Sequence, residues 1–293
     1  MANSPAHKLG QLLGNFIESR FTSILQQICF ERSLYLDVVG QTRAARRGKK
    51  VTWEDIYGSK HDLDFVIERF GSYDSLGEPV ALIECAWRRY TKHSKNKAQE
   101  IQGAVLPIAQ KHYMQKPFLG AIIAGDFTAP SITQLNSCGF KTLYFTSDQI
   151  FTAFDTHQLN MRYGESTSDE MALSKVQQFE SLDSAQLDSV WRTLTLSAQG
   201  QIQSFTQELI ASLDRRITTI VISPLYGNSH VFHDTSEAMN FLSQTDFSIV
   251  PQLHSLQRIF VRVEFGNGDK IEGTFSDALT ARNMLSIAIT NNP

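Results

Sequence analysis

Two acidic side chains in strand-like surroundings are the residues of this chain best suited to chemistry. Glu84 interrupts the apolar run VALIECAW, which has the pattern of a buried strand. Asp64 lies near the start of a second such run, HDLDFVIE, with Asp62 two residues before it. A buried carboxylate that lacks a partner is strongly destabilising, so this arrangement requires a cation. Carboxylate oxygens gathered at one edge of a sheet suit Mg²⁺, with Mn²⁺ as a substitute.

A hairpin is expected to bring these acids together. Residues 71–79 carry Asp, Gly and Pro and predict a turn between antiparallel strands. Asp64 and Glu84 would then occupy neighbouring positions. Asp62 and Asp64 share a face of the expected strand, so periodicity alone does not separate them. We expect Glu68, at the far end of that strand, to face solvent.

The cation that such a site needs is expected on the following helix. Ala86 shares the strand face of Glu84, so no lysine stands there. Ser94 is a suitable N-cap for a helix over residues 95–113. The apolar residues of this helix are Ala98, Ile101, Ala104, Val105 and Ile108. Lys97 lies roughly 40° from the centre of their stripe, whereas Lys95 lies more than about 110° away. Lys97 is therefore predicted to face the strand that carries Glu84.

These acids, strands and helix-borne lysine resemble the PD-(D/E)XK nuclease superfamily, and most of all a type II restriction endonuclease. Members of that superfamily place an acid and a lysine two residues apart on a strand. Ala86 departs from that pattern, so the chain resembles members whose lysine has moved to the next helix. We prefer Asp64 to Asp62 as the metal ligand, because the sequence DFVI resembles the acid-then-apolar strand of the family. The motif is short and degenerate, but the expected order of elements over residues 43–155 agrees with the family core.

The resemblance implies Mg²⁺-dependent hydrolysis of a phosphodiester in double-stranded DNA. Asp64, Glu84 and the backbone carbonyl of Cys85 would hold the ion, which polarises a phosphoryl oxygen and lowers the pKa of a bound water. Lys97 would orient or help to deprotonate that water and offset transition-state charge. Glu100 is read either as a supporting acid behind the site, a role also open to Asp62, or as an exposed partner of Lys97. A homodimer that cuts one strand per subunit is implied.

Two basic clusters flank the expected site. The first is the loop RAARRGKK and the second follows the Glu84 strand; their residues are Arg43, Arg46, Arg47, Lys49, Lys50, Arg88, Arg89, Lys92 and Lys95. Each cluster is interpreted either as a solvated loop or as a set of DNA phosphate contacts. Their position beside the acids favours phosphate contacts.

The pattern of elements predicts a mixed α/β fold built on a restriction-endonuclease-like core. Residues 1–42 are expected to be a helical segment, 43–155 the nuclease core, and 156–293 a C-terminal α/β extension for target recognition or dimerisation. Within the extension, residues 157–189 are expected to be a polar linker with short helices. Residues 259–265 and 270–275 flank a GNGD turn and predict a hairpin. Strand-then-helix occurs twice, without a convincing repeat.

Composition argues against a membrane-spanning, a disulfide-rich or a zinc-binding protein. The 293 residues are 42% hydrophobic with a net charge of −3, and no apolar run approaches a membrane span. Three scattered cysteines form neither a disulfide framework nor a zinc pattern, so we expect a cytoplasmic protein away from membranes. Two alternatives stay open. One is a DNA-binding or assembly subunit with a decayed site, and the other is a repair or modified-DNA nuclease of the same superfamily.

Overall fold

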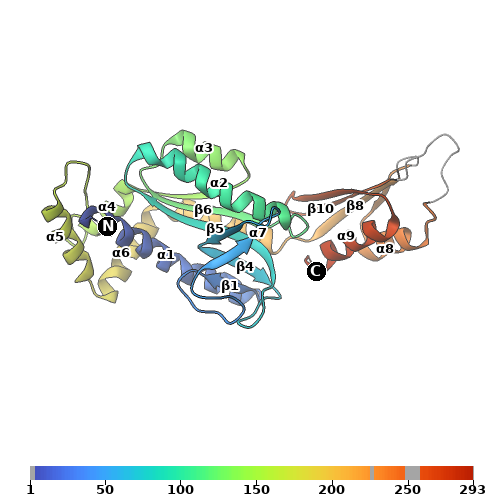
Figure 1. Cartoon of the computed structure of the whole chain (residues 1–293), viewed down its shortest axis with the longest axis horizontal. Coiled ribbons are helices and arrows are strands. Elements are labelled where there is room, and N and C mark those ends of the chain that lie inside the picture. The colour runs from blue at the N-terminus through green and yellow to red at the C-terminus, as the bar shows by residue number, and fades with distance from the viewer. Residues whose placement is uncertain (1–3, 225–227, 248–257, 293) are drawn as a thin grey trace.

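The chain folds into a mixed α/β structure with a large central sheet and a smaller C-terminal sheet (Figure 1). The computed structural model describes residues 4–224, 228–247 and 258–292. Its elements are α1 (Pro5–Glu31), β1 (Tyr35–Val38), β2 (Val51–Glu54), β3 (Lys60–Leu63), β4 (Phe65–Arg69), β5 (Glu78–Arg88), the 3₁₀ turn η1 (Thr91–His93), α2 (Ser94–Lys111), β6 (Phe118–Gly125), α3 (Ala129–Ser137), β7 (Lys141–Thr146), α4 (Ser147–Asp155), α5 (Asp169–Glu180), α6 (Ser184–Ser197), α7 (Gln199–Leu213), β8 (Ile217–Pro224), β9 (His230–Phe232), α8 (Thr235–Gln244), β10 (Ile259–Phe265), β11 (Lys270–Phe275) and α9 (Ala278–Thr290). The predicted fold class is thereby confirmed.

The central sheet has the strand order β1-β4-β5-β6-β7. Strands β1, β4 and β5 pair antiparallel, whereas β5, β6 and β7 pair parallel. Helix α2 connects β5 to β6 and α3 connects β6 to β7, as parallel pairing requires a crossover. Strand β5 is central and reads as a nearly continuous apolar run because both of its faces are covered.

Alternation along β5 directs its side chains into two separate cores. Leu82 and Ala86 pack with α2 and α3 in one core. Ile83 packs in the other core, with α1, α4 and α7. The sheet is thus the middle layer between two helical layers. Strand β5, which carries Glu84, contacts both α1 and α2.

The N-terminal segment is helical over a shorter stretch than expected. Ser4 caps α1 by accepting a hydrogen bond from the His7 N–H, and the helix ends at Glu31. Strand β1 then forms the edge of the central sheet, paired with β4. The predicted boundary at residue 43 therefore falls inside the sheet. A four-residue edge strand is too short to show a clear period of its own.

The expected linker over residues 157–189 is instead part of the core. Helix α5 and the adjoining helix α6 contribute Val176, Phe179, Val190 and Leu194 to the core that contains α1. The ring of Phe16 on α1 lies 6.4 Å from that of Phe179. The segment looked like a linker because each amphipathic helix exposes a broad polar face.

The C-terminal unit is a four-stranded antiparallel sheet with the order β11-β10-β8-β9. Helices α8 and α9 pack with β8 and β10 in a third core. The predicted β10–β11 hairpin is confirmed by the pairing of Ile259 with Phe275 through Glu264 with Lys270.

This unit contains a repeat that was not convincing from sequence. Each half is a hairpin followed by a helix, and the central strands β8 and β10 pair with one another. The helix starts read DTSEAMNFLS from Asp234 and DALTARNMLS from Asp277, with Asp, Ala, Asn, Leu and Ser in common. Both aspartates cap their helices through the N–H three residues later. The strands have diverged, which hid the relationship.

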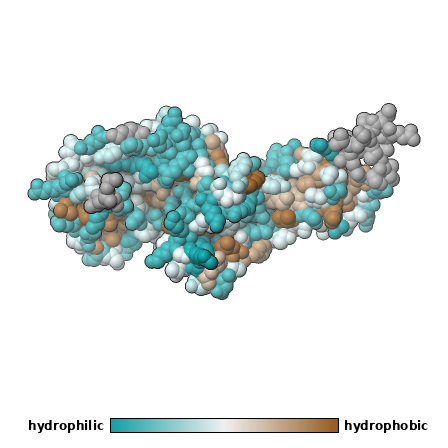
Figure 2. Space-filling model, in the orientation of Figure 1, coloured by the Kyte–Doolittle hydropathy of each residue, from teal (hydrophilic) through white to brown (hydrophobic). Residues whose placement is uncertain are grey.

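Arg215 fastens the C-terminal unit to the central one. Its buried guanidinium donates to the Lys116 carbonyl at 2.7 Å and to Asn292 Oδ1 at 2.8 Å, and pairs with Asp269 at 3.0 Å. In Figure 2, hydrophilic residues cover most of the surface around α2 and α3, and hydrophobic residues form scattered patches elsewhere. Of the helices in the described residues, none is long and apolar enough to cross a membrane.

Candidate active site

Asp64 and Glu84 face one another across the β4–β5 pair. Phe65 is the register partner of Ile83, which places Asp64, just before β4, across from Glu84. Asp64 Oδ2 accepts a hydrogen bond from the Cys85 N–H at 2.7 Å. This contact holds the Asp64 carboxylate at the β5 strand. The predicted juxtaposition of these two acids follows from the antiparallel hairpin.

Asp62 lies elsewhere, although a shared strand face was expected. It belongs to β3, which pairs with β2 in a separate two-stranded sheet. Its carboxylate accepts hydrogen bonds from Lys50 Nζ and Thr52 Oγ1, each at 2.6 Å. The chain changes partners between β3 and β4, and this change breaks the alternation that the sequence implied. The structure therefore distinguishes Asp64 from Asp62 as the neighbour of Glu84.

Glu84 is buried without enough compensation for a negative charge. Only 7% of its surface is exposed, and its Oε1 has no hydrogen-bond partner. Burial, reinforced by the Asp64 charge, raises the pKa of Glu84 to about 8. Burial also raises the pKa of Asp64, against the lowering effect of the Cys85 N–H. Two buried acids thus compete for too little positive charge.

Lys97 supplies part of that charge from the first turn of α2. It lowers the pKa of both Asp64 and Glu84. Its side chain is 13% exposed, and its Nζ lies 2.8 Å from Glu100 Oε1. Lys95 is exposed. The helix geometry expected for Lys97 and Lys95 is therefore present, with Glu100 as the ion-pair partner of Lys97.

The start of α2 differs in detail from the prediction. His93 is the N-cap residue, without a side-chain hydrogen bond to the helix. Ser94 is the first helical residue, and its hydroxyl donates to the Thr91 carbonyl at 2.8 Å. The 3₁₀ turn η1, which ends at His93, directly precedes this helix start.

Glu18 is a third acid at this site that sequence reasoning missed. It lies on α1, which packs against β5, and burial together with the Asp64 charge raises its pKa to about 7. Its one visible signal is an acid placed between the buried residues Ile17 and Phe21. That signal is weak, because it does not tell which strand the helix covers.

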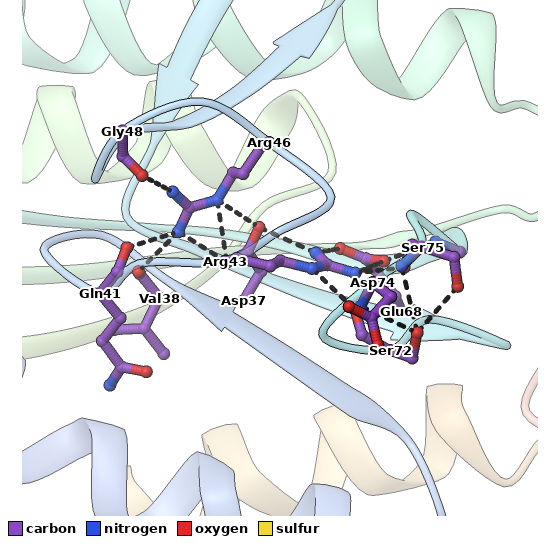
Figure 3. A network of polar contacts seen from close by, with 11 residues as sticks. Asp37, Val38, Gln41, Arg43, Arg46, Gly48, Glu68, Ser72, Asp74 and Ser75 are labelled. Atoms are coloured by element: carbon purple, nitrogen blue, oxygen red, sulfur yellow. Dashed lines mark hydrogen bonds and ion pairs between the residues drawn. The ribbon is translucent and has the colours of Figure 1, made fainter.

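Arg43 and Arg46 are structural residues, and the prediction that they contact DNA is wrong. Arg43 is buried and its guanidinium binds both Glu68 oxygens, at 2.5 and 2.9 Å, and Asp37 at 3.0 Å (Figure 3). Arg46 binds Asp37 through Nε at 2.9 Å, and its side chain is 7% exposed. Glu68 is fully buried, contrary to its expected exposure. Strand β1 causes the difference, since it brings Asp37 beside β4.

The other expected DNA contacts are differently placed. Arg47, Lys49 and Lys50 are exposed, and Lys50 pairs with Asp62. Arg89 forms an ion pair with Asp126, and Arg88 lies 3.6 Å from Glu100. The Lys92 side chain lies outside the described part of the chain. Arg47, Lys49 and Lys95 are thus the exposed members for which the described structure gives no ion pair.

The donor set fits a hard divalent cation. Asp64 and Glu84 offer carboxylate oxygens, and the unpartnered Glu84 Oε1 is a buried acceptor that a cation would satisfy. Across residues 4–224, 228–247 and 258–292, no three His, Cys, Asp or Glu side chains are gathered closely enough to hold a metal by themselves. An ion at Asp64 and Glu84 would therefore take further oxygens from backbone or water, as Mg²⁺ commonly does.

Comparisons with known proteins add little. No family model and no curated protein matches the chain. A solved structure described as "Protein of Unknown Function AF1548" is 14% identical, with a TM-score of 0.29 over 64% of this chain and 95% of the other. A TM-score this low supports no argument about fold or function.

Proposed function

We propose that this protein is a Mg²⁺-dependent endonuclease that hydrolyses phosphodiester bonds of double-stranded DNA. The observation that supports the proposal most is the pairing of Asp64 with Glu84 across β4 and β5, with Glu84 Oε1 buried and unpartnered. A structural acid in the core would be expected to have its oxygens satisfied. The unpartnered oxygen of Glu84 is what we expect of an acid whose partner is a bound cation.

Each residue has a definite task in this proposal. Asp64 and Glu84 hold the divalent ion, Mg²⁺ or Mn²⁺, and the Cys85 carbonyl is a further oxygen donor. When bound, the ion activates water and stabilises charge on the phosphate. The Cys85 N–H fixes the Asp64 carboxylate. Lys97 positions the attacking water and offsets negative charge at the phosphate, in place of a lysine at Ala86.

The more specific form of the proposal is a type II restriction endonuclease that acts as a homodimer in the cytoplasm. The exposed cations Arg47, Lys49 and Lys95 support phosphate contact. The free thiols of Cys29, Cys85 and Cys138 agree with a reducing compartment. The C-terminal unit would then serve in target recognition or dimerisation.

The decisive experiment incubates the purified protein with plasmid DNA, with and without Mg²⁺. Discrete fragments that require Mg²⁺ are expected, and the Asp64→Asn variant should produce none. A smear would indicate a nuclease without sequence preference. Retardation of the DNA without any cleavage would contradict the proposal and favour a DNA-binding subunit.

A further inference from the structure

A cavity of about 730 Å³ lies between the N-terminal half of α1 and the end of β5. It reaches Glu18, Cys85 and Lys97, so it adjoins the carboxylate site. Helix α1 begins near the point marked N in Figure 1. The volume falls within the range of about 300–1,000 Å³ that is typical of ligand pockets.

Aromatic rings form part of this cavity. Trp87 Nε1 donates a hydrogen bond to the Tyr163 hydroxyl at 3.2 Å, which fixes both rings. Gly10 and Gly14, one turn apart on α1, leave room for them. A Cβ at Gly10 would lie 3.0 Å from the Tyr163 hydroxyl, and one at Gly14 would lie 3.3 Å from the Trp87 Cβ. Tyr163 is itself buried, so the half-buried ring of Trp87 is the one on which a nucleobase would stack, without regard to sequence.

The rest of the wall is polar and partly cationic. Exposed amides of Gln11, Asn15 and Asn96 line the cavity. Amides both donate and accept hydrogen bonds, so they match the edges of unpaired bases. Arg88 and His93 also line it, and the Arg88 side chain is 34% exposed. The Arg88 guanidinium, which lies 3.6 Å from Glu100 in the same wall, would meet a phosphate that flanks such a base.

Resting on the proposed nuclease function, we propose that this cavity receives one unpaired deoxynucleotide next to the phosphate that is cut. Bases in a regular duplex are stacked and paired, so none of them enters a lateral cavity unless it leaves the stack. The substrate class is therefore DNA in which one nucleotide leaves the stack at the cleavage point, either extruded from the duplex or already unpaired in a bulge or flap. Extrusion from a duplex costs unstacking and unpairing energy, so a nucleotide that is already unpaired should bind more tightly.

Binding of two matched DNA probes tests the proposal on the full chain. One is a fully paired duplex, and the other carries a single unpaired 2-aminopurine at its centre. Ca²⁺ replaces Mg²⁺ to prevent cleavage. We expect about tenfold tighter binding of the second probe, the order of one base stacked on an aromatic ring. Quenching of the 2-aminopurine emission on binding should accompany it. Equal affinity for the two probes would overturn the proposal.

Two tryptophan variants locate the effect. Asn15→Trp fills the cavity from an exposed helix position and should abolish the preference while affinity for the paired duplex is retained. Gln26→Trp is the matched control, because Gln26 is exposed on the same helix and does not line the cavity. It should behave as wild type. A preference that survives in Asn15→Trp would contradict the assignment.

The outcomes separate this inference from the nuclease proposal. Selective binding of the unpaired probe without any cleavage in Mg²⁺ would overturn the nuclease function and leave the cavity assignment supported. Cleavage that is equally fast on both probes, with equal binding, would overturn the cavity assignment and leave the nuclease function supported. Free deoxyadenosine monophosphate should compete poorly with the unpaired probe. Competition at concentrations near that of the DNA would show that the cavity binds free nucleotides, and would overturn the assignment of a nucleotide within a strand.

Discussion

Two clusters of buried acids in this chain differ in how far their negative charge is compensated by cations. Asp37 and Glu68 are buried and accept six hydrogen bonds from Arg43 and Arg46, at 2.5–3.1 Å. Asp64 and Glu84 are also largely buried, but within the described part of the chain the one cation that lowers their pKa values is Lys97, which is shared with Glu100.

The difference separates a structural cluster from a candidate ligand site. In the Arg43 cluster each carboxylate has a guanidinium partner, so its negative charge is compensated within the fold. At Glu84 the chain leaves an oxygen unpartnered and the pKa well above its ordinary value. Such uncompensated charge is destabilising unless another cation contributes, which is why perturbed acids mark functional sites.

The largest expected effect is on catalysis at the uncompensated site. Glu84→Gln should lower Mg²⁺-dependent cleavage by about 10³-fold, because one of the two carboxylate ligands is lost. Initial rates on plasmid DNA measure it. Asp64→Asn should do the same, whereas Asp62→Asn, in its separate sheet, should cost far less. Activity of Glu84→Gln within tenfold of wild type would show that the site is misassigned.

The next largest effect is on the stability of the compensated cluster. Arg43→Met removes the shared guanidinium and leaves Glu68 and Asp37 buried with less positive charge, which should lower the free energy of unfolding by about 3–5 kcal/mol. Urea denaturation measures this change. Arg47→Met in the same loop is the control and should change it little, since Arg47 is exposed. Equal effects of the two changes would contradict the distinction between the clusters.

Removal of the Lys97 ammonium from the candidate site comes third. Lys97→Ala should slow cleavage by on the order of 10²-fold, while binding to DNA in Ca²⁺ changes little. Lys95→Ala is the matched control on the exposed side of the same turn. Adding Ala86→Lys to Lys97→Ala should restore part of the rate, because it returns an ammonium to the strand face of Glu84. Normal cleavage by Lys97→Ala would exclude it as the catalytic cation.

A pH effect on stability follows from the raised pKa of Glu84. The folded pKa of Glu84, about 8, lies above the ordinary value of 4.5 for a glutamate side chain, so the folded state binds the extra proton. In the Mg²⁺-free protein the contribution of Glu84 to stability is therefore fully present below about pH 4.5 and is lost as the pH rises through about 8. From pH 6 to 8 the loss should be about 2 kcal/mol, measured by urea denaturation. Glu84→Gln should flatten the curve; an unchanged slope in that variant would assign it to other groups.

The smallest expected effect concerns DNA phosphates. Arg47→Ala with Lys49→Ala should weaken binding to all DNA sequences alike and reduce the salt slope by about two counterions. Binding titrations at several salt concentrations measure it. A loss of preference at one base position, with the salt slope unchanged, would show that this loop reads bases.

Sequence predicted the central strands well because their signals are local. Strand β5 is a long apolar run, and the turn before it is rich in Gly and Pro, so the antiparallel pair and the juxtaposition of Asp64 and Glu84 could be inferred. The structural role of Arg43 could not be inferred from the sequence, because its partners Asp37 and Glu68 belong to two strands whose pairing the sequence did not reveal. Glu18 needed the same knowledge of long-range packing, since its neighbour Asp64 is distant in the chain.

The packing of α1 has a consequence for how the chain folds during synthesis. Leu9, Phe21 and Leu25 of α1 share one core with Val190, Leu194 and Leu209, which are made much later. Helix α1 therefore leaves the ribosome long before its apolar stripe can be fully covered, and it must wait for α5 to α7. A fragment cut at residue 155 would expose that stripe and aggregate, whereas one that extends through Leu213 would retain the whole core.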